Sequence, residues 1–191
     1  FVPKGAAFTA KRKEARRVML NVASKLLGQQ FADDTIIVST GGRYEFRNKG
    51  IDILLESLNR LSNEPSLDRD VLAFINVPAW VKGPRKDLQE RLDSPLHSVT
   101  PLSTPVITHE LYNMDDDKAL SMMRAIGLNN DPSSRVKVIF VPCYLNGNDG
   151  IFNMPYYDLL PGDDLAVYPS YYEPWGYTPL ESVAFHVPTI T

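Results

Sequence analysis

The stretch Tyr168-Pro-Ser-Tyr-Tyr-Glu-Pro-Trp-Gly-Tyr-Thr-Pro-Leu-Glu181 determines how the rest of the chain is interpreted. It contains two carboxylates, Glu173 and Glu181. Between them lie Gly176 and the start of the helix-start pattern Thr178–Glu181. The first N–H groups of a new helix have no intrahelical partner, and the helix dipole favours an anion beside them. A carboxylate just ahead of such a turn can bind the hydroxyl groups of the molecule that carries the anion. The stretch therefore predicts a site for a phosphate-bearing sugar.

Around this stretch, apolar runs of strand length alternate with segments of helical periodicity. The expected strands are 35–40, 71–77, 136–141, 165–168 and 189–191, and the expected helices are 10–29, 51–61, 115–127 and 178–187. This alternation predicts an α/β fold with a Rossmann-like parallel sheet and helices on both faces. Ligands of such sheets bind beyond the carboxyl ends of the strands. We therefore expect the loops after Thr40, Val141 and Tyr168 to converge on one crevice.

The 191 residues fit one domain, so we expect residues 1–191 to form a single nucleotide-binding domain. Residues 78–105 are rich in proline, serine and charge, and we interpret them as an excursion from the core with a short polar helix near 85–92. Phe1 in place of a methionine, and an end at Thr191 inside an expected strand, favour a piece of a longer protein.

Composition narrows the class of protein. A net charge of −3 and a pI near 5.6 argue against broad nucleic-acid binding. The apolar runs fall short of the roughly 20 residues that cross a bilayer, and no signal peptide is evident. The single cysteine, Cys143, has no internal disulfide partner. We therefore expect a cytoplasmic protein without a membrane segment.

The loop Gly41–Gly50 places two cations between a strand and a helix. Lys49 lies at a helix start, where the dipole disfavours a cation, so an anion is expected beside it. Arg43 can bind a diphosphate through two N–H groups. The alternative is that both are ordinary surface cations, and we interpret the basic run 11–17 as a solvated helix face.

The remaining candidates each have a structural alternative. Tyr144 and Tyr156 can stack on a nucleotide base or pack in the core. Glu181 can complete a capping box with Thr178, with Pro179 at the first helical position. Glu173 can be a solvated loop carboxylate.

The histidines His97, His109 and His186 are scattered along the chain, and none has a second histidine or cysteine at ligand spacing. We therefore expect neither a metal centre nor a cofactor.

Taken together, the segments from about Thr35 to Thr191 resemble the C-terminal half of glycogen synthases of the animal and fungal type, which use UDP-glucose. The residues that carry this resemblance are Gly42–Asp52, Thr108–Leu111, Arg135–Phe140 and Pro169–Pro179.

The resemblance implies the C-terminal, donor-nucleotide domain of a two-domain GT-B glycosyltransferase. The implied reaction is retaining, metal-independent transfer of glucose to the non-reducing end of an α-1,4-glucan. The implied partners are a nucleotide sugar, a glucan acceptor and an N-terminal domain of the same chain, and the full-length form is a possible homo-oligomer.

The resemblance also implies roles for individual residues. Arg43 and Lys49 match the cations that neutralise the diphosphate, and Glu173 matches the carboxylate at the glucose. Glu181 matches the carboxylate that binds the ribose. The turn whose N–H groups meet the diphosphate matches Gly176, Tyr177 and Thr178. The aromatic residue that stacks on the uracil matches Tyr156, and the residues that hold the edge of the base match Tyr144 and Leu145.

The chain also departs from the family pattern. It has Val141-Pro142-Cys143 in place of His-Pro-Glu, and Asp164 in place of a histidine that belongs to the glucose-6-phosphate site of the eukaryotic enzymes. The 78–105 excursion is shorter than the eukaryotic counterpart, which helps to build a tetramer. These differences fit a bacterial relative. The alternatives are another GT-B glucosyltransferase, with an ADP-glucose donor or a different acceptor, and a non-catalytic nucleotide-sugar-binding module.

Overall fold

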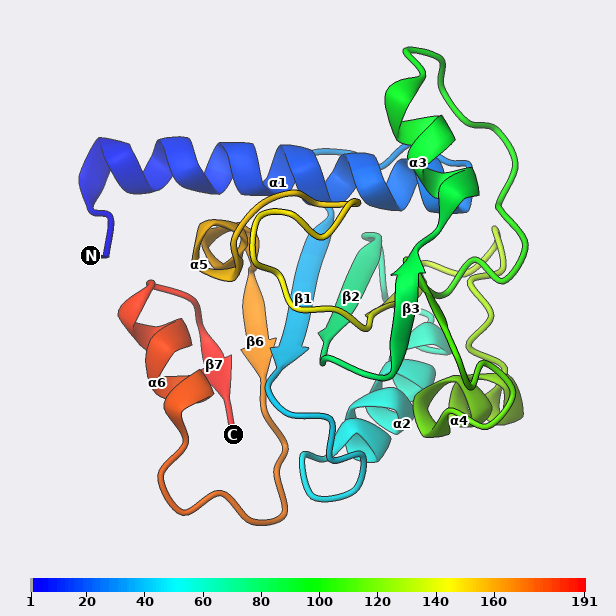
Figure 1. The fold of residues 1–191 in the computed structure, drawn as a ribbon. Helices are drawn as coiled ribbons and strands as arrows, with labels where there is room; N and C mark the ends of the chain where they lie inside the picture. Colours follow the sequence, from blue (N-terminus) through cyan, green and yellow to red (C-terminus); the bar gives the residue numbers. More distant parts are fainter. Residues whose placement is uncertain (1) are drawn as a thin grey trace.

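The computed structural model describes residues 2–191, and Phe1 lies outside the described residues. Its centre is a five-stranded parallel sheet in the order β5-β2-β1-β6-β7 (Figure 1). The strands are β1 (Ile36–Gly41), β2 (Val71–Asn76), β5 (Val136–Val141), β6 (Leu165–Val167) and β7 (Thr189–Ile190). The predicted α/β, Rossmann-like class is confirmed.

Helices cover both faces of this sheet, as predicted. On one face, α1 (Gly5–Leu27) and α3 (Lys86–Asp93) pack on residues such as Ile37, Leu72 and Ile139. On the other face, α2 (Ile51–Ser62) and α4 (Lys118–Ile126) pack on the neighbouring residues Val38, Ala73 and Val138. The side chains divide in this way because successive residues of a strand point to opposite faces.

The adjacent strands β5, β2 and β1 end level with one another. Gly41 pairs with Asn76, and Asn76 pairs with Val141. The chain passes from β1 outward to β2 and β5, and then returns to β6 on the other side of β1. This reversal puts a topological switch point between β1 and β6, where parallel sheets of this kind bind ligands at their carboxyl edge.

The 78–105 excursion is tied to the body of the molecule. It contains β3 (Val81–Pro84), which pairs antiparallel with β4 (His109–Leu111), and α3, the helix expected near 85–92. The buried Arg85 side chain donates to the carbonyls of Ser103, Thr104 and Ile107. The β3–β4 ribbon was not expected from sequence.

Three expected helix starts are wrong. Helix α1 begins at Gly5 rather than near residue 10. Helix α4 begins at Lys118 rather than near residue 115, because the Asp117 side chain accepts a hydrogen bond from the Leu120 N–H and caps the helix there. Helix α6 spans Tyr177–Ala184 and begins one residue before Thr178, because Gly176 takes a left-handed conformation (φ 72°) at the N-cap.

Two short helical segments complete the fold: α5 (Tyr156–Leu159) and a 3₁₀ turn, η1 (Leu160–Gly162). Among residues 2–191, every helix is too short or too polar to traverse a bilayer.

Candidate functional site

A cavity of about 440 Å³ opens at the carboxyl edge of the sheet. Its lining comes from the ends of β1, β2 and β5 and from the α5 and α6 regions. The lining residues are Gly42, Arg43, Tyr44, Asn76, Pro78, Cys143, Tyr144, Leu145, Tyr156 and Thr178. The predicted convergence is confirmed for the loops after β1 and β5, whereas the segment after β6 reaches the cavity only through Thr178, the second residue of α6.

Arg43 lies at the mouth of this cavity. Its side chain is 81% exposed and lies 3.2 Å from the carboxylate of Glu45. The next residue, Tyr44, anchors the loop: its hydroxyl donates to Asp117 at 2.7 Å and accepts from the Ala119 N–H at 3.0 Å. Burial, together with the Asp117 carboxylate, raises the pKa of Tyr44, so the phenol keeps its proton. The anchored Tyr44 fixes the loop that carries Arg43 at the edge of the sheet.

Lys49 and Glu173 form an ion pair between the two loops that the sequence singled out. Their side chains are only 14% and 29% exposed, so the pair is partly shielded from water. Neither residue lines the 440 Å³ cavity. Close approach of the two loops makes the pair possible, because the Tyr171 N–H donates to the Asn48 carbonyl at 2.9 Å.

Gly50 permits this approach. It starts α2 at φ 65°, and a Cβ added there would lie 1.9 Å from the carbonyl oxygen of Pro169. No side chain fits into that space. A glycine at this position therefore brings Lys49 to Glu173.

The N-terminus of α6 lies beside the same ion pair. Gly176 is buried, and a Cβ added to it would lie 3.4 Å from Glu173 Cγ. Because Pro179 has no N–H, the first turn offers the N–H groups of Tyr177 and Thr178. Thr178 lines the cavity, whereas the Tyr177 side chain is 71% exposed.

The capping-box alternative for Glu181 is wrong. The helix begins at Tyr177, so Pro179 is its third residue and Glu181 lies too far along to cap it. The Glu181 carboxylate instead accepts a hydrogen bond of 2.9 Å from the Tyr157 hydroxyl. Glu181 is therefore directed toward α5.

The other end of the cavity is aromatic and apolar. Tyr144 is 77% exposed, and Leu145 accepts a backbone hydrogen bond from Tyr156 at 2.9 Å. The ring of Tyr156 is half-buried, with its hydroxyl 3.6 Å from where a Cβ on Gly41 would lie. Tyr144 is thus exposed enough for a base to stack on it. Tyr156 packs against a buried cluster and also lines the cavity.

Sequence reasoning missed Asn76, Pro78 and Cys143 as lining residues. Asn76 is the last residue of β2, and a polar side chain at that place in an apolar run was a usable signal. Cys143 lies two residues beyond the end of β5, in the loop expected to reach the crevice, so its place in that loop was also a usable signal.

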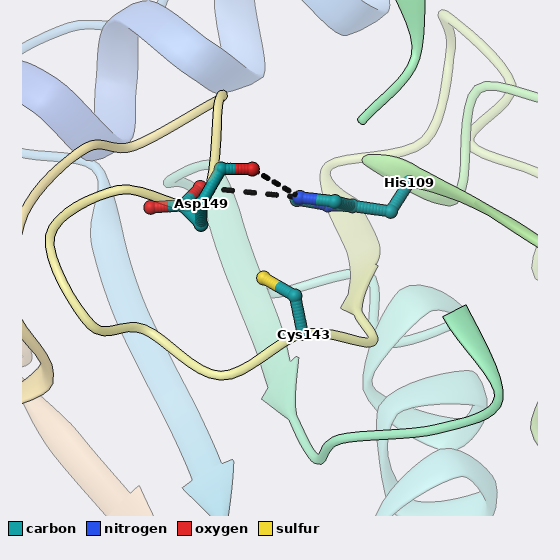
Figure 2. Close-up of side chains that lie close together, drawn as sticks. All are labelled: His109, Cys143 and Asp149. Atoms are coloured by element: carbon teal, nitrogen blue, oxygen red, sulfur yellow. Dashed lines mark hydrogen bonds and ion pairs between the residues drawn. The ribbon is translucent and has the colours of Figure 1, made fainter. Parts of the chain in front are cut away.

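The expectation that the histidines are isolated is wrong for His109. Its ring lies beside Cys143 and Asp149, with ligand atoms all within 4.8 Å of one another (Figure 2). Own-chain hydrogen bonds occupy this cluster: His109 Nε2 lies 2.9 Å from the Asp149 carbonyl oxygen, and Nδ1 lies 2.8 Å from the Thr108 hydroxyl.

The Asp149 carboxylate is occupied in the same way. It accepts N–H groups from Ile151, Phe152 and Asn153. Burial lowers the pKa of His109, and burial with the Asp149 charge raises the pKa of Cys143 to about 12. The Cys143 thiol therefore keeps its proton in this arrangement. We interpret the cluster as a clasp between β4 and the segment after β5.

A larger groove of about 930 Å³ runs along α1. Its three arginines are engaged by the chain itself: Arg12 and Arg16 both bind the carboxylate of Asp164, and Arg17 pairs with Glu14. The basic run is therefore not only a solvated face, because Arg12 and Arg16 also link α1 to Asp164 beside the sheet. Asp164 thus has a structural role as the partner of two arginines.

Comparison with known proteins agrees with the geometry. The family model described as glycogen synthase matches residues 24–84 and 95–191, with a gap over α3. The chain is similar to the glycogen [starch] synthase of Neurospora crassa, with 32% identity in an alignment that covers 83% of this chain and 30% of that protein. It is also similar to isoform 1 of Saccharomyces cerevisiae (31% identity; 83% and 31% covered) and to the human liver protein (33% identity; 83% and 30% covered). The chain matches about a third of the length of these curated relatives.

Proposed function

We propose, because this chain belongs to the glycogen synthase family, that it is the donor-nucleotide domain of a retaining glucosyltransferase. The full-length protein would transfer glucose from UDP-glucose to the non-reducing end of an α-1,4-glucan. One observation carries the proposal: Arg43, the Lys49–Glu173 ion pair and the first turn of α6 meet at the carboxyl edge of a parallel sheet.

The chemistry of the leaving group explains this arrangement. UDP departs with developing negative charge, and fixed cations and N–H dipoles lower the barrier most where that charge grows. Arg43 and Lys49 supply the cations, and the first turn of α6 supplies the dipoles. With two cations on the diphosphate, we propose that the transfer runs without a metal ion or another cofactor.

Glu173 is proposed to face the glucose. In the structure its carboxylate pairs with Lys49. A bound diphosphate competes with Glu173 for this ammonium. Donor binding thus frees the carboxylate to contact the sugar at the same time as it positions Lys49 on the leaving group.

The nucleoside is proposed to occupy the aromatic end of the cavity. Tyr156 provides a ring for uracil, Tyr144 and Leu145 hold the base edge, and Glu181 accepts hydrogen bonds from the ribose hydroxyls. Gly176, Tyr177 and Thr178 form the turn at the diphosphate.

We also propose that residues 1–191 form one such domain, with 78–105 as a shortened excursion. The glucan acceptor would bind between it and an N-terminal domain of the same chain. Closure of two domains supplies the water-excluded site that glycosyl transfer needs. A cytoplasmic location and a possible homo-oligomeric form complete the proposal.

The decisive experiment measures incorporation of radiolabelled glucose into glycogen by the full-length protein, with UDP-glucose and with ADP-glucose. We expect incorporation from UDP-glucose. Incorporation from ADP-glucose alone would favour the other GT-B glucosyltransferase, and UDP binding without incorporation would favour a non-catalytic nucleotide-sugar-binding module.

A further inference from the structure

Tyr157 joins two short helices at the side of the crevice. From α5, its hydroxyl donates to Glu181 Oε1 in α6 at 2.9 Å. Its ring stacks on Phe185, with centroids 5.5 Å apart and planes 13° apart. Phe185 is the C-cap residue of α6, and its N–H donates to the Glu181 carbonyl four residues earlier at 3.0 Å. The two side chains therefore lie on the same face of the helix, and one tyrosine contacts both. The stacking fixes the tyrosine, and its hydroxyl fixes the carboxylate.

This contact leaves half of the carboxylate available. A carboxylate has lone pairs on both oxygens. Tyr157 uses Oε1, and among the described residues Oε2 of Glu181 has no protein hydrogen-bond partner. The hydrogen bond to Glu181, with burial and the Glu181 charge, raises the pKa of Tyr157. The phenol therefore remains a donor at neutral pH and does not remove the negative charge.

Tyr157 also connects Glu181 to the cavity wall. It follows Tyr156 directly, and their ring centroids lie 5.4 Å apart with planes at 62°. Burial raises the pKa of Tyr156, so its hydroxyl keeps its proton. Two neighbouring tyrosines thus serve the two parts of a nucleoside. The ring of Tyr156 would face the base, and the hydroxyl of Tyr157 holds the carboxylate that would bind the ribose.

We propose that Tyr157 is a positioning residue: it orients the carboxylate of Glu181 so that the free oxygen accepts hydrogen bonds from the vicinal hydroxyls of a ribose. The inference rests on the proposed function, because it assumes that a nucleoside diphosphate occupies the cavity. It adds a residue that neither the motifs nor the comparisons indicated.

The test compares two nucleotides on the full-length protein. Affinities for UDP and for 2′,3′-dideoxy-UDP, which lacks the vicinal hydroxyls, are measured by calorimetry for wild type and for Tyr157→Phe. The variant keeps the stacked ring and loses the hydroxyl. We expect UDP to bind about three- to tenfold more weakly, as for loss of one hydrogen bond, and dideoxy-UDP to bind as before. The ratio of the affinity for UDP to the affinity for dideoxy-UDP then falls by the same factor.

Tyr112→Phe is the control, because it removes the hydroxyl of an exposed tyrosine outside the cavity lining. We expect wild-type affinities for both nucleotides. An unchanged preference in Tyr157→Phe overturns the inference, and so does an equal loss for both nucleotides, because that result shows a purely structural role. If the wild-type protein binds neither nucleotide, the proposed function itself fails, a result distinct from the other two.

Discussion

At the scale of single residues, the site depends on charges that the chain itself partly neutralises. Lys49 is paired with Glu173, and Arg43 with Glu45. The two pairs differ in exposure: Arg43 is 81% exposed, whereas Lys49 is 14% exposed. An exposed pair contributes little to stability. Arg43 is therefore available for an anionic ligand at small cost to the fold, whereas Lys49 must exchange a partly shielded partner for the ligand.

Replacing the cations tests this interpretation. We expect Arg43→Ala and Lys49→Ala to lower the turnover of the full-length protein at least about tenfold, because each removes a charge from the developing diphosphate. Arg60→Ala is a matched control for Arg43: its side chain is 80% exposed and pairs with Glu56 at 3.3 Å, on the outer side of α2. It should leave turnover unchanged. Wild-type turnover in Arg43→Ala or Lys49→Ala would refute their assignment.

Glu173 allows a test in which catalysis and binding respond differently. We expect Glu173→Gln to lower turnover at least about tenfold, as for loss of one charged group at the reacting centre. UDP affinity should be retained or increased, because Lys49 loses its competing carboxylate. Steady-state kinetics and UDP titration measure the two effects. A large loss of UDP affinity would show that Glu173 holds the nucleotide rather than the sugar.

At the scale of elements, the sequence predicts what is local. The run Val136–Val141 matches β5 residue for residue, because its apolar character starts and stops with the strand. The start of α6 was misplaced because Thr178 and Pro179 are good helix starters, while the left-handed Gly176 decides the boundary. The β3–β4 ribbon and the His109 cluster escaped prediction because their partners lie far apart in sequence.

The same distinction applies to the candidate site. Arg43, Tyr144, Leu145, Tyr156 and Thr178 were predicted and do line one cavity. Their motifs lie at strand ends, which topology alone brings together. The contact of Glu181 with Tyr157 could not be predicted, because it depends on how α5 packs against α6.

Gly50 provides a prediction for the contact between two loops. Gly50→Ala combines a strained φ with a clash against Pro169, whereas Gly127→Ala, at φ 78° and with open space around it, carries the strain alone. Backbone strain of this kind costs of order 1–3 kcal/mol. We expect Gly50→Ala to lower the free energy of unfolding by at least about 2 kcal/mol more than Gly127→Ala does, because forced overpacking adds its own cost. Urea denaturation of both variants measures the difference, and equal losses would contradict the close approach.

At the scale of the whole molecule, one buried carboxyl links stability to pH. Asp163 is 3% exposed and accepts a hydrogen bond from Ser39, while its Oδ1 has no protein partner among the described residues. Burial raises its pKa to about 8, against a usual value of 3.8. The folded state therefore binds this proton more tightly than the unfolded state. The resulting stabilisation is complete below pH 4 and is lost progressively as pH rises toward 8.

The pKa of the neighbouring Asp164 shifts in the opposite direction, so its effect on stability has the opposite pH dependence. Although burial alone raises its pKa, hydrogen bonds from the Ile37 N–H, Arg16 and Arg12 together lower it below the usual value. Its contribution is present above pH 4 and is lost in more acidic solution. Between pH 5 and 8, Asp164 stays ionised. Of these two groups, Asp163 therefore determines how the free energy of unfolding changes with pH.

Asp163→Asn should flatten that slope. An asparagine keeps an acceptor for Ser39 and carries no charge, so no ionisation is penalised in the folded state. We expect the free energy of unfolding of the wild-type chain, from urea denaturation, to fall between pH 5 and 8 by up to about 1.4 kcal/mol per pH unit relative to Asp163→Asn. Asp116→Asn, at an exposed position, is the control and should keep the wild-type slope. Parallel profiles for wild type and Asp163→Asn would mean that Asp163 is ionised in the folded protein, with Arg12 and Arg16 as the nearest cations to offset its charge.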